Sequence, residues 1–470
     1  MKKTGIGIKI ICACVLLLLV VYAGGCYYYG NHFQRGTLID QVDVSNLTVQ
    51  DLADRVDAYF LRIQERKSDG SSYEESIDGK AIDLSYASTE PLQQIPREQN
   101  RYLWFLPQHE EHETEALLSY NKEKLTQAVQ ALKGFEEDFA QAPTNAHISE
   151  YTPEAGFSIV AETQGNELDQ AKTLEVISNA VEELKGLVDL DAEGCYEIPT
   201  VTSDSEELQN TLQKLQKYGT VTITYRFGDN IEVLDGSTIS TWLEVDGFAV
   251  TLDQTQVENY VATLRKKYDS IFRSRTFMTS YGKEITVDGG DYGWWMNYQQ
   301  EAKELAAQIE TGESGERTPV YYQTAASYGT PDYGDTYVEI NLTAQHLFFY
   351  KDGQLVMESD FVSGNSARGY DTPEGTYSIT YKQRNATLVG ENYETPVSYW
   401  MPFNKNIGMH DATWRSSFGG TIYKTKGSHG CINMPYEKAQ ELYGYIEKGT
   451  PVICYHLAGT ERSTESELEK

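Results

Sequence analysis

An uninterrupted apolar run lies near the N-terminus of the chain. Residues 10–29 include no charged side chain over 20 positions, which is long enough to cross a bilayer as a helix. Three lysines precede the run, and neither Lys nor Arg follows it before Arg35. Because basic residues mark the cytoplasmic end of membrane helices, the pattern predicts a single-pass anchor with the rest of the chain outside the cell. A cleaved signal peptide, with or without lipidation at Cys26, is the alternative interpretation.

Helical spacing of apolar residues recurs at two places between residues 101 and 320. In each copy a polar residue that suits a helix N-terminus precedes apolar residues three or four positions apart, and the copies are offset by 132 residues. A strand, a glycine and a second helix follow at an offset of 128. The matching positions are Asn121, Leu125, Val129, Leu132, Ile159, Gly165, Leu168, Ile177 and Val181 in the first copy, and Asp253, Val257, Val261, Leu264, Val287, Gly293, Met296, Leu305 and Ile309 in the second. This repeat predicts two α+β modules.

The pattern changes to short strands after a Gly- and Pro-rich stretch at residues 325–335. Residues 337–342 and 345–350 favour strands, a turn follows at 351–353, and residues 354–363 return as a third strand. We therefore expect an α+β multidomain chain that ends in a mostly-β domain.

The patterns divide the chain into seven parts. These are a cytoplasmic segment with the membrane helix (1–34), an extracellular stalk or start of the first module (35–100), the first module (101–210), the second module (211–324), a linker (325–335), the C-terminal domain (336–457) and a polar tail (458–470).

Acidic residues strongly outnumber basic ones. The chain holds 70 Asp and Glu against 39 Lys and Arg, which gives a formal net charge of −31. Nucleic-acid binding needs a basic surface, so we exclude this class of partner. The acidity is uneven, because residues 336–456 carry 10 basic and 12 acidic residues. Nearly all of the excess negative charge therefore lies outside the C-terminal domain.

Residue types that support thiol chemistry gather between residues 407 and 435. This segment contains His410, Ser428, His429, Gly430 and Cys431. A neighbouring imidazole converts a thiol into the nucleophilic thiolate, and a glycine lets a substrate approach the backbone closely. A buried, inert cysteine beside two unrelated histidines is the other interpretation. The polar and glycine-rich surroundings favour a nucleophile.

Spacing alone leaves two candidates for the general base. His429 and Cys431 are two positions apart, so they share a face if the segment is a strand. His410 is the second candidate, and sequence spacing does not rank the two.

This segment resembles the active-site motif of L,D-transpeptidases with a YkuD-type catalytic domain. In that motif a histidine is followed, after a gap of variable length, by Ser/Thr-His-Gly-Cys, an apolar residue and Asn or Arg. His410 and residues 428–433 match it in type and order. One departure concerns the residue after the first histidine, which is Gly in many members and Asp411 here. Its backbone carbonyl is expected to orient the imidazole.

The resemblance implies an extracellular cysteine acyltransferase that makes 3→3 cross-links between peptidoglycan stem peptides, as a target of carbapenems. Cys431 is then the nucleophile, His410 the general base, and His429 a supporting donor or alternative base. Backbone N–H groups near Gly430 and Cys431 are expected to bind the oxyanion. A thioester stores the acyl energy, so neither a metal nor a cofactor is implied. Water as the acceptor gives L,D-carboxypeptidase activity from the same site.

Further residues are candidates for binding the donor peptide. They are Ser428, Asn433, Trp414, Tyr399, Trp400 and Met401. Ser428 and Asn433 are expected to orient the loop or the donor. For Trp400 and Met401, a place in the hydrophobic core is the equally weighted alternative.

The two modules resemble the peptidoglycan-binding domain that precedes the catalytic domain in some Gram-positive L,D-transpeptidases. The matching stretches are 143–146 with 157–160, and 277–280 with 289–294. The resemblance implies that the modules bind the cell wall. Tyr292, Trp294 and Trp295 are candidates for stacking on sugar rings, although aromatic residues more often lie in a core or on a sheet surface.

Two other classes of protein compete with this interpretation. A sortase is also a membrane-anchored Cys/His enzyme, but its Thr-Leu-x-Thr-Cys strand and downstream Arg are absent from this sequence. A non-catalytic cell-wall binding protein would use the two modules and leave the C-terminal domain without activity. The intact run of residues 428–431 argues against that loss.

Overall fold

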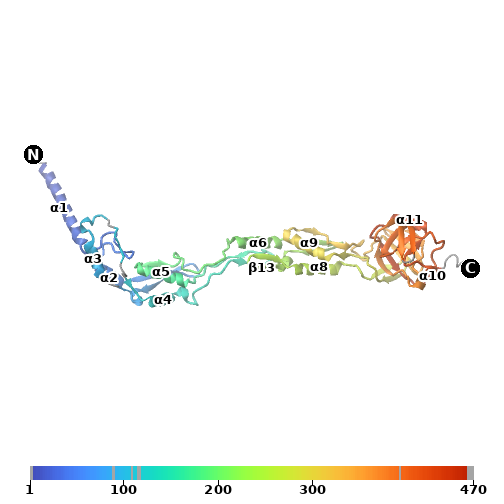
Figure 1. The fold of residues 1–470 in the computed structure, drawn as a ribbon, viewed down its shortest axis with the longest axis horizontal. Coiled ribbons are helices and arrows are strands. Elements are labelled where there is room, and N and C mark those ends of the chain that lie inside the picture. Colours follow the sequence, from blue (N-terminus) through green and yellow to red (C-terminus); the bar gives the residue numbers. More distant parts are fainter. Residues whose placement is uncertain (1–3, 87–89, 107–108, 114–117, 391–392, 463–470) are drawn as a thin grey trace. The chain divides into compact units, whose positions relative to one another are not determined.

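The computed structural model describes residues 4–86, 90–106, 109–113, 118–390 and 393–462. These residues form two compact units, which are Met1–Ser149 with Ile159–Gln209, and Glu150–Ser158 with Asn210–Lys470. Both units mix helices and strands, which confirms the α+β multidomain class (Figure 1).

The apolar N-terminal run is helical. Helix α1 (Thr4–Tyr28) has large, well-exposed apolar side chains along most of its length, including Leu16, Leu17 and Leu18. Its stretch Ile8–Tyr28 is long and apolar enough to cross a membrane, and a signal sequence would share these features.

The first unit also contains the first of the two repeated modules. Its elements after α1 are β1 (Leu38–Ile39), β2 (Val42–Asp43), α2 (Val49–Asp57), β3 (Phe60–Arg66), β4 (Ser72–Asp78), β5 (Ser85–Tyr86), α3 (Glu90–Glu98), β6 (Glu111–His112), β7 (Leu118–Ser119), α4 (Lys122–Gln130), β8 (His147–Ile148), β9 (Ile159–Val160), α5 (Gln170–Glu182) and β10 (Leu187–Asp189). Its core extends from Phe33 to Tyr196. Residues 60–78, assigned from the sequence to a stalk or module start, therefore form strands of this folded unit.

The second unit begins with the second module. Its elements are α6 (Glu206–Gly219), which starts just before the unit boundary, β11 (Ile223–Phe227), β12 (Asn230–Leu234), α7 (Gly236–Ile239), β13 (Leu243–Asp246), β14 (Ala249–Leu252), α8 (Gln254–Tyr268), β15 (Arg275–Met278), β16 (Glu284–Val287), β17 (Trp295–Met296), α9 (Tyr298–Thr311), β18 (Gly315–Arg317) and β19 (Tyr321–Gln323). Asp253 caps α8 with its side chain, as Asn121 caps α4.

The two modules share one topology. In the first, β3 pairs antiparallel with β4 and parallel with β10, and in the second β11 pairs antiparallel with β12 and parallel with β18. In each module two helices pack side by side, α4 with α5 and α8 with α9 (Figure 1). The predicted helix pairs are therefore confirmed, and a three-stranded sheet extends the repeat beyond the positions that the sequence pattern identified.

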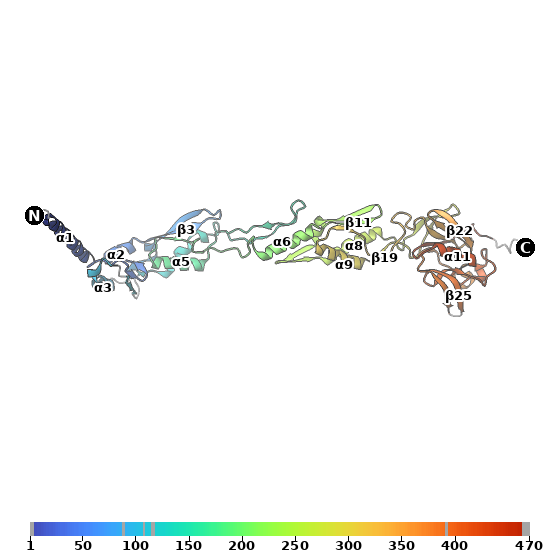
Figure 2. The same cartoon turned by 90° about the horizontal axis from the view of Figure 1, so that it is seen from above.

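The C-terminal domain contains two sheets. Their strands are β20 (Tyr337–Asn341), β21 (His346–Lys351), β22 (Gln354–Asp360), β23 (Gly375–Ser378) and β28 (Pro451–Tyr455) in the first, ordered β22-β21-β20-β28-β23, and β24 (Gln383–Gly390), β25 (Tyr393–Asn404), β26 (Ile407–Asp411) and β27 (Ile432–Met434) in the second, in sequence order. Besides the short α10 (Tyr423–Lys426), helix α11 (Tyr436–Tyr445) contacts strands β22, β25 and β26 of both sheets (Figure 2). The mostly-β prediction is confirmed, as are the three strands between residues 337 and 363.

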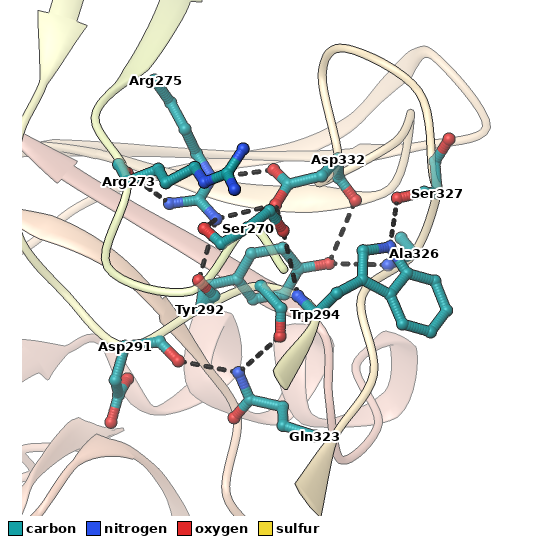
Figure 3. A network of polar contacts seen from close by, with 11 residues as sticks. Ser270, Arg273, Arg275, Asp291, Tyr292, Trp294, Gln323, Ala326, Ser327 and Asp332 are labelled. Carbon is teal, nitrogen blue, oxygen red and sulfur yellow. Dashed lines mark hydrogen bonds and ion pairs between the residues drawn. The ribbon is translucent and has the colours of Figure 1, made fainter. Parts of the chain in front are cut away.

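Residues 325–335, predicted as a linker, are held in place by buried polar contacts (Figure 3). Arg275 forms two hydrogen bonds of 2.7 Å to the carboxylate of Asp332, and both side chains are buried. Ser270 also donates to Asp332 at 2.6 Å, and the indole of Trp294 donates to the Ser327 carbonyl at 2.7 Å. Within the second unit, this segment is therefore part of the packed structure and not a free tether.

Candidate active site

Pairing of two short strands brings the separated parts of the motif together. Strand β26 ends in His410 and Asp411, and it runs parallel to β27, which begins directly after Cys431. In this register His410 lies opposite Asn433. The 17 residues between His410 and Ser428 form a loop with the short helix α10. The fold thus places the distant histidine beside the Ser-His-Gly-Cys run.

Cys431 lies in a largely apolar setting. Its side chain clusters with Trp400, Val397 and Ala386, and the residue is 9% exposed. The Sγ atom lies 3.6 Å from the backbone oxygen of Asn406. Burial raises the pKa of the Cys431 thiol to about 11. At neutral pH the resting nucleophile is therefore a thiol, and a base must remove its proton when it attacks.

His410 is prepared to act as that base. Its Nδ1 donates a hydrogen bond to the backbone oxygen of Asp411 at 2.8 Å, which leaves Nε2 as the proton acceptor. The ring lies between two indoles, with centroids 5.9 Å from both Trp400 and Trp414. Burial lowers the pKa of the imidazole, while the contact with Asp411 opposes this shift. A neutral imidazole with a defined tautomer results.

The side chain of Asp411 points to the neighbouring strand. Its Oδ1 accepts hydrogen bonds of 2.8 Å from the backbone N–H groups of Ser398 and Tyr399 in β25. The carboxylate is buried and satisfied by these donors. The aspartate therefore fits where many family members have glycine, and its carbonyl stays available to orient His410.

Ser428 shapes the turn that carries the nucleophile. Its hydroxyl donates to the carbonyl of Cys431 at 2.6 Å and accepts from the N–H of Gly430 at 3.0 Å. Gly430 has a φ of +122°, which other residues rarely adopt. Thr372 also donates to the Gly430 carbonyl at 2.7 Å. The predicted loop-orienting role of Ser428 thus has a geometric basis in the hydrogen bonds of this turn.

Asn433 links the base to a cation. In the orientation that satisfies all of its polar atoms, its amide nitrogen donates to His410 Nε2 at 3.1 Å. Its oxygen then accepts from Nε and Nη2 of Arg415 at 2.8 and 3.2 Å. Asn433 is buried, and it faces His410 from the opposite side of the ring to Asp411.

A cleft of about 230 Å³ opens at Cys431. Its lining consists of Leu388, Thr395, His410, Trp414, Arg415, Gly427, Ser428, His429, Cys431 and Asn433. Six of the residues predicted from the sequence are in this set. His429 contributes its ring next to that of Tyr370, at a centroid distance of 4.8 Å.

Three predicted substrate-binding residues lie behind the cleft. Tyr399 and Met401 belong to the hydrophobic core of the C-terminal domain, where they are 2% and 0% exposed. Trp400 packs against Cys431 and His410 without lining the cleft. The structure places all three on β25, so they support the site from the core side.

Several cleft residues were absent from the sequence prediction. Arg415 follows Trp414 in a polar loop, and no local pattern distinguishes it from a solvated charge. Leu388 and Thr395 lie opposite each other in the β24–β25 hairpin. Only strand pairing, which the sequence does not specify for this hairpin, brings them to Cys431.

The aromatic residues proposed for sugar contact have different environments. Tyr292 is fully buried, and Trp294 stacks on Tyr328 with centroids 3.8 Å apart. Trp295 is 36% exposed and lies 4.8 Å from the exposed ring of Tyr322. Among the three, Trp295 is the side chain that the second module presents most openly to solvent.

Comparison with known proteins places these features in a family. Residues 335–454 match the YkuD model, the L,D-transpeptidase catalytic domain. Residues 72–189 and 201–317 each match the model named "Putative peptidoglycan binding domain". No curated protein sequence matches the chain.

Solved structures resemble the C-terminal half of the chain. An avibactam carbamoyl enzyme is 36% identical over 53% of this chain and 98% of its own, with a TM-score of 0.44. A cysteine-to-serine mutant of an Enterococcus faecium L,D-transpeptidase is 36% identical over 53% and 100%, with a TM-score of 0.43. The catalytic domain of an E. faecium L,D-transpeptidase acylated by ertapenem is 45% identical over 26% and 98%, with a TM-score of 0.25.

The matched models define a peptidoglycan transpeptidase with wall-binding modules before its catalytic domain. The chain belongs to the L,D-transpeptidase family, as the motif around Cys431 indicated.

Proposed function

We propose that this L,D-transpeptidase forms 3→3 cross-links in peptidoglycan through a thioester on Cys431. The observation that carries the proposal is the pairing of β26 with β27. It places in one cleft a buried thiol and an imidazole whose Nδ1 is fixed by the Asp411 carbonyl. This arrangement supplies a nucleophile and a base with a defined tautomer.

In the first half-reaction, His410 Nε2 takes the proton of Cys431 as Sγ attacks the carbonyl carbon of the third stem residue. The bond to the terminal D-Ala breaks, and the D-Ala amine leaves with the proton from His410. A thioester to Cys431 remains. Because burial raises the thiol pKa to about 11, proton transfer accompanies the attack and does not precede it.

In the second half-reaction, an amine of a neighbouring stem attacks the thioester. His410 accepts a proton from this amine, the new amide forms, and the proton returns to the departing sulfur of Cys431. We assign oxyanion stabilisation to backbone N–H groups near the nucleophile, with that of Cys431 foremost, because the Gly430 N–H already donates to Ser428. Water in place of the amine yields the carboxypeptidase reaction.

The remaining parts of the chain suit an enzyme of the cell surface. We propose that Ile8–Tyr28 anchors it in the cell membrane, with the catalytic domain outside a Gram-positive cell. The two modules then bind the wall near the substrate. The related E. faecium catalytic domain is acylated by ertapenem, and we propose that carbapenems acylate Cys431 in this chain as well.

Incubation of the full chain, purified in detergent, with tetrapeptide muropeptides tests this function. Mass spectrometry of the products is expected to show loss of D-Ala and appearance of 3→3 dimers. The Cys431→Ala variant, checked for folding by circular dichroism, is expected to give neither. Loss of D-Ala without dimers, even with added acceptor, would favour a carboxypeptidase. A folded native chain that leaves the muropeptides unchanged would favour the non-catalytic binding protein.

A further inference from the structure

Arg415 carries the only permanent charge among the described residues that line the cleft. Its Nη1 donates to the backbone oxygen of Lys426 at 2.9 Å, and its Nε and Nη2 contact the amide oxygen of Asn433. All of these partners are neutral. Burial lowers the pKa of the guanidinium, and no carboxylate of the described chain offsets that cost. The cation therefore lacks the anionic partner that a partly buried arginine normally has.

The guanidinium has hydrogen-bonding capacity left. Of its five N–H groups, one on Nε, one on Nη2 and one on Nη1 are engaged by Asn433 and Lys426. One N–H on each of the two terminal nitrogens remains. Two such groups match the two oxygens of a carboxylate, and charge-assisted pairs of this kind are among the stronger hydrogen bonds in proteins.

We propose that Arg415 binds the terminal carboxylate of the donor stem peptide. This inference deepens the proposed function and rests on it. The donor is cleaved next to its last residue, so its carboxylate lies one residue from the carbonyl that Cys431 attacks. Arg415 and Cys431 line the same cleft, and the cleft offers no other permanent charge among its described residues.

This contact explains how the site measures the length of the stem. In a tetrapeptide, the carboxylate belongs to the leaving D-Ala and can pair with Arg415 while the third residue faces Cys431. In a pentapeptide, the carboxylate lies one residue further from the same bond. The anchoring contact with Asn433 adds a second effect, because it connects the bound carboxylate to the base His410.

The test compares two donors in native and variant chains. One donor is the tetrapeptide with a free D-Ala carboxylate, and the other is the same peptide ending in D-Ala amide. For the native chain we expect kcat/KM to be at least about tenfold higher for the acid, since one charge-assisted contact contributes about 1.4 kcal/mol or more. In Arg415→Met this ratio is expected to fall to within about threefold of one.

The matched control is Lys424→Met, which removes a nearby cation outside the cleft lining. It should keep the native preference for the acid. If Arg415 only orients Asn433 and His410, Arg415→Met will slow both donors equally and keep their ratio. That result, or a native chain without preference, would overturn the proposal. Arg415→Lys, which keeps the charge without the fork, is expected to give an intermediate ratio and serves if the methionine variant does not fold.

A binding readout separates failure of this inference from failure of the proposed function. The rate of Cys431 alkylation by iodoacetamide is measured with each peptide present. If neither donor is cleaved by the folded native chain, the cross-linking function fails. Stronger protection of Cys431 by the acid than by the amide, lost in Arg415→Met, would still support the carboxylate site. Equal protection by both peptides would refute it.

Discussion

At the residue scale, the main question is how a buried thiol becomes a nucleophile. Cys431 is surrounded by apolar side chains, and burial raises its pKa, whereas burial lowers the pKa of His410. Both shifts favour the neutral pair over a thiolate beside an imidazolium. The site therefore differs from cysteine enzymes that hold a preformed thiolate, and it activates the thiol only as the substrate is attacked.

This account predicts how Cys431 responds to pH. Because the thiolate is the reactive form, alkylation by iodoacetamide should increase with pH and reach its midpoint near the pKa of about 11. The alkylated peptide is quantified by mass spectrometry. Urea-unfolded chain provides the control, in which the midpoint should return to about 8.5, the value of a free cysteine. A midpoint below that of the unfolded chain would indicate a preformed thiolate and contradict the account.

Part of this site could be predicted from the sequence. The residue types and the motif identified Cys431, His410 and Ser428, because their chemistry is encoded in a short run. The solution at Asp411 could not be predicted, since its carboxylate is satisfied by backbone N–H groups of β25. Arg415 was missed because its role depends on Asn433, which a parallel strand pairing places beside it.

At the element scale, the nucleophile loop is held by a close backbone contact. Gly364 follows β22 and bridges to Ser428, while Asn365 and Ser363 exchange backbone hydrogen bonds with the same residue. A Cβ atom on Gly364 would lie 1.7 Å from the backbone oxygen of Tyr370 and 3.0 Å from the Cα of Gly430. The first contact is with the backbone, so no rotamer change relieves it.

We expect Gly364→Ala to disrupt this loop. The clash should lower the free energy of unfolding by about 1–3 kcal/mol and reduce D-Ala release strongly, because Gly430 must move. Thermal unfolding and muropeptide turnover measure the two effects. Gly444→Ala in α11 is the matched control, as its Cβ meets nothing within 4 Å and alanine favours a helix by up to about 1 kcal/mol. Equal stability and activity of the two variants would contradict this role for Gly364.

The elements themselves were predicted unevenly. Helices α4 and α8 were evident from their capping residues and apolar spacing, and strands β20 to β22 from their alternation and turn. The sheet of the repeated module was not recognised as part of the repeat. In the first module, residues 79–121 separate β4 from α4, whereas 19 residues separate β12 from α8. This difference in length hides the correspondence of the strands.

At the scale of the molecule, the junction before the catalytic domain is built as a packed interface within the second unit. Phe277, Tyr292 and Tyr333 share a core with Tyr455 of β28. The buried pair of Arg275 and Asp332 holds the connecting segment, as Figure 3 shows. A Gly- and Pro-rich composition predicted a linker here but could not show that it is fastened, because the partners are 40 to 60 residues away in sequence.

We predict that Asp332→Asn destabilises the second unit. The substitution leaves the Arg275 cation buried without its counter-charge, which costs about 3–5 kcal/mol. Urea unfolding followed by tryptophan fluorescence measures the loss. Glu316→Gln is the control, since its ion pair with Arg226 is exposed on both sides and should contribute less than about 1 kcal/mol. The prediction fails if both variants lose the same free energy.

The central claim is that Cys431 carries the acyl group, and intact-mass spectrometry after incubation with ertapenem tests it most directly. We expect the folded chain to gain the mass of one drug molecule, with peptide mapping locating the adduct on Cys431. Cys431→Ala should gain no mass, and the peptide with Cys26 serves as an internal control for nonspecific thiol modification. An adduct at another residue, or no adduct on a folded native chain, would contradict the account.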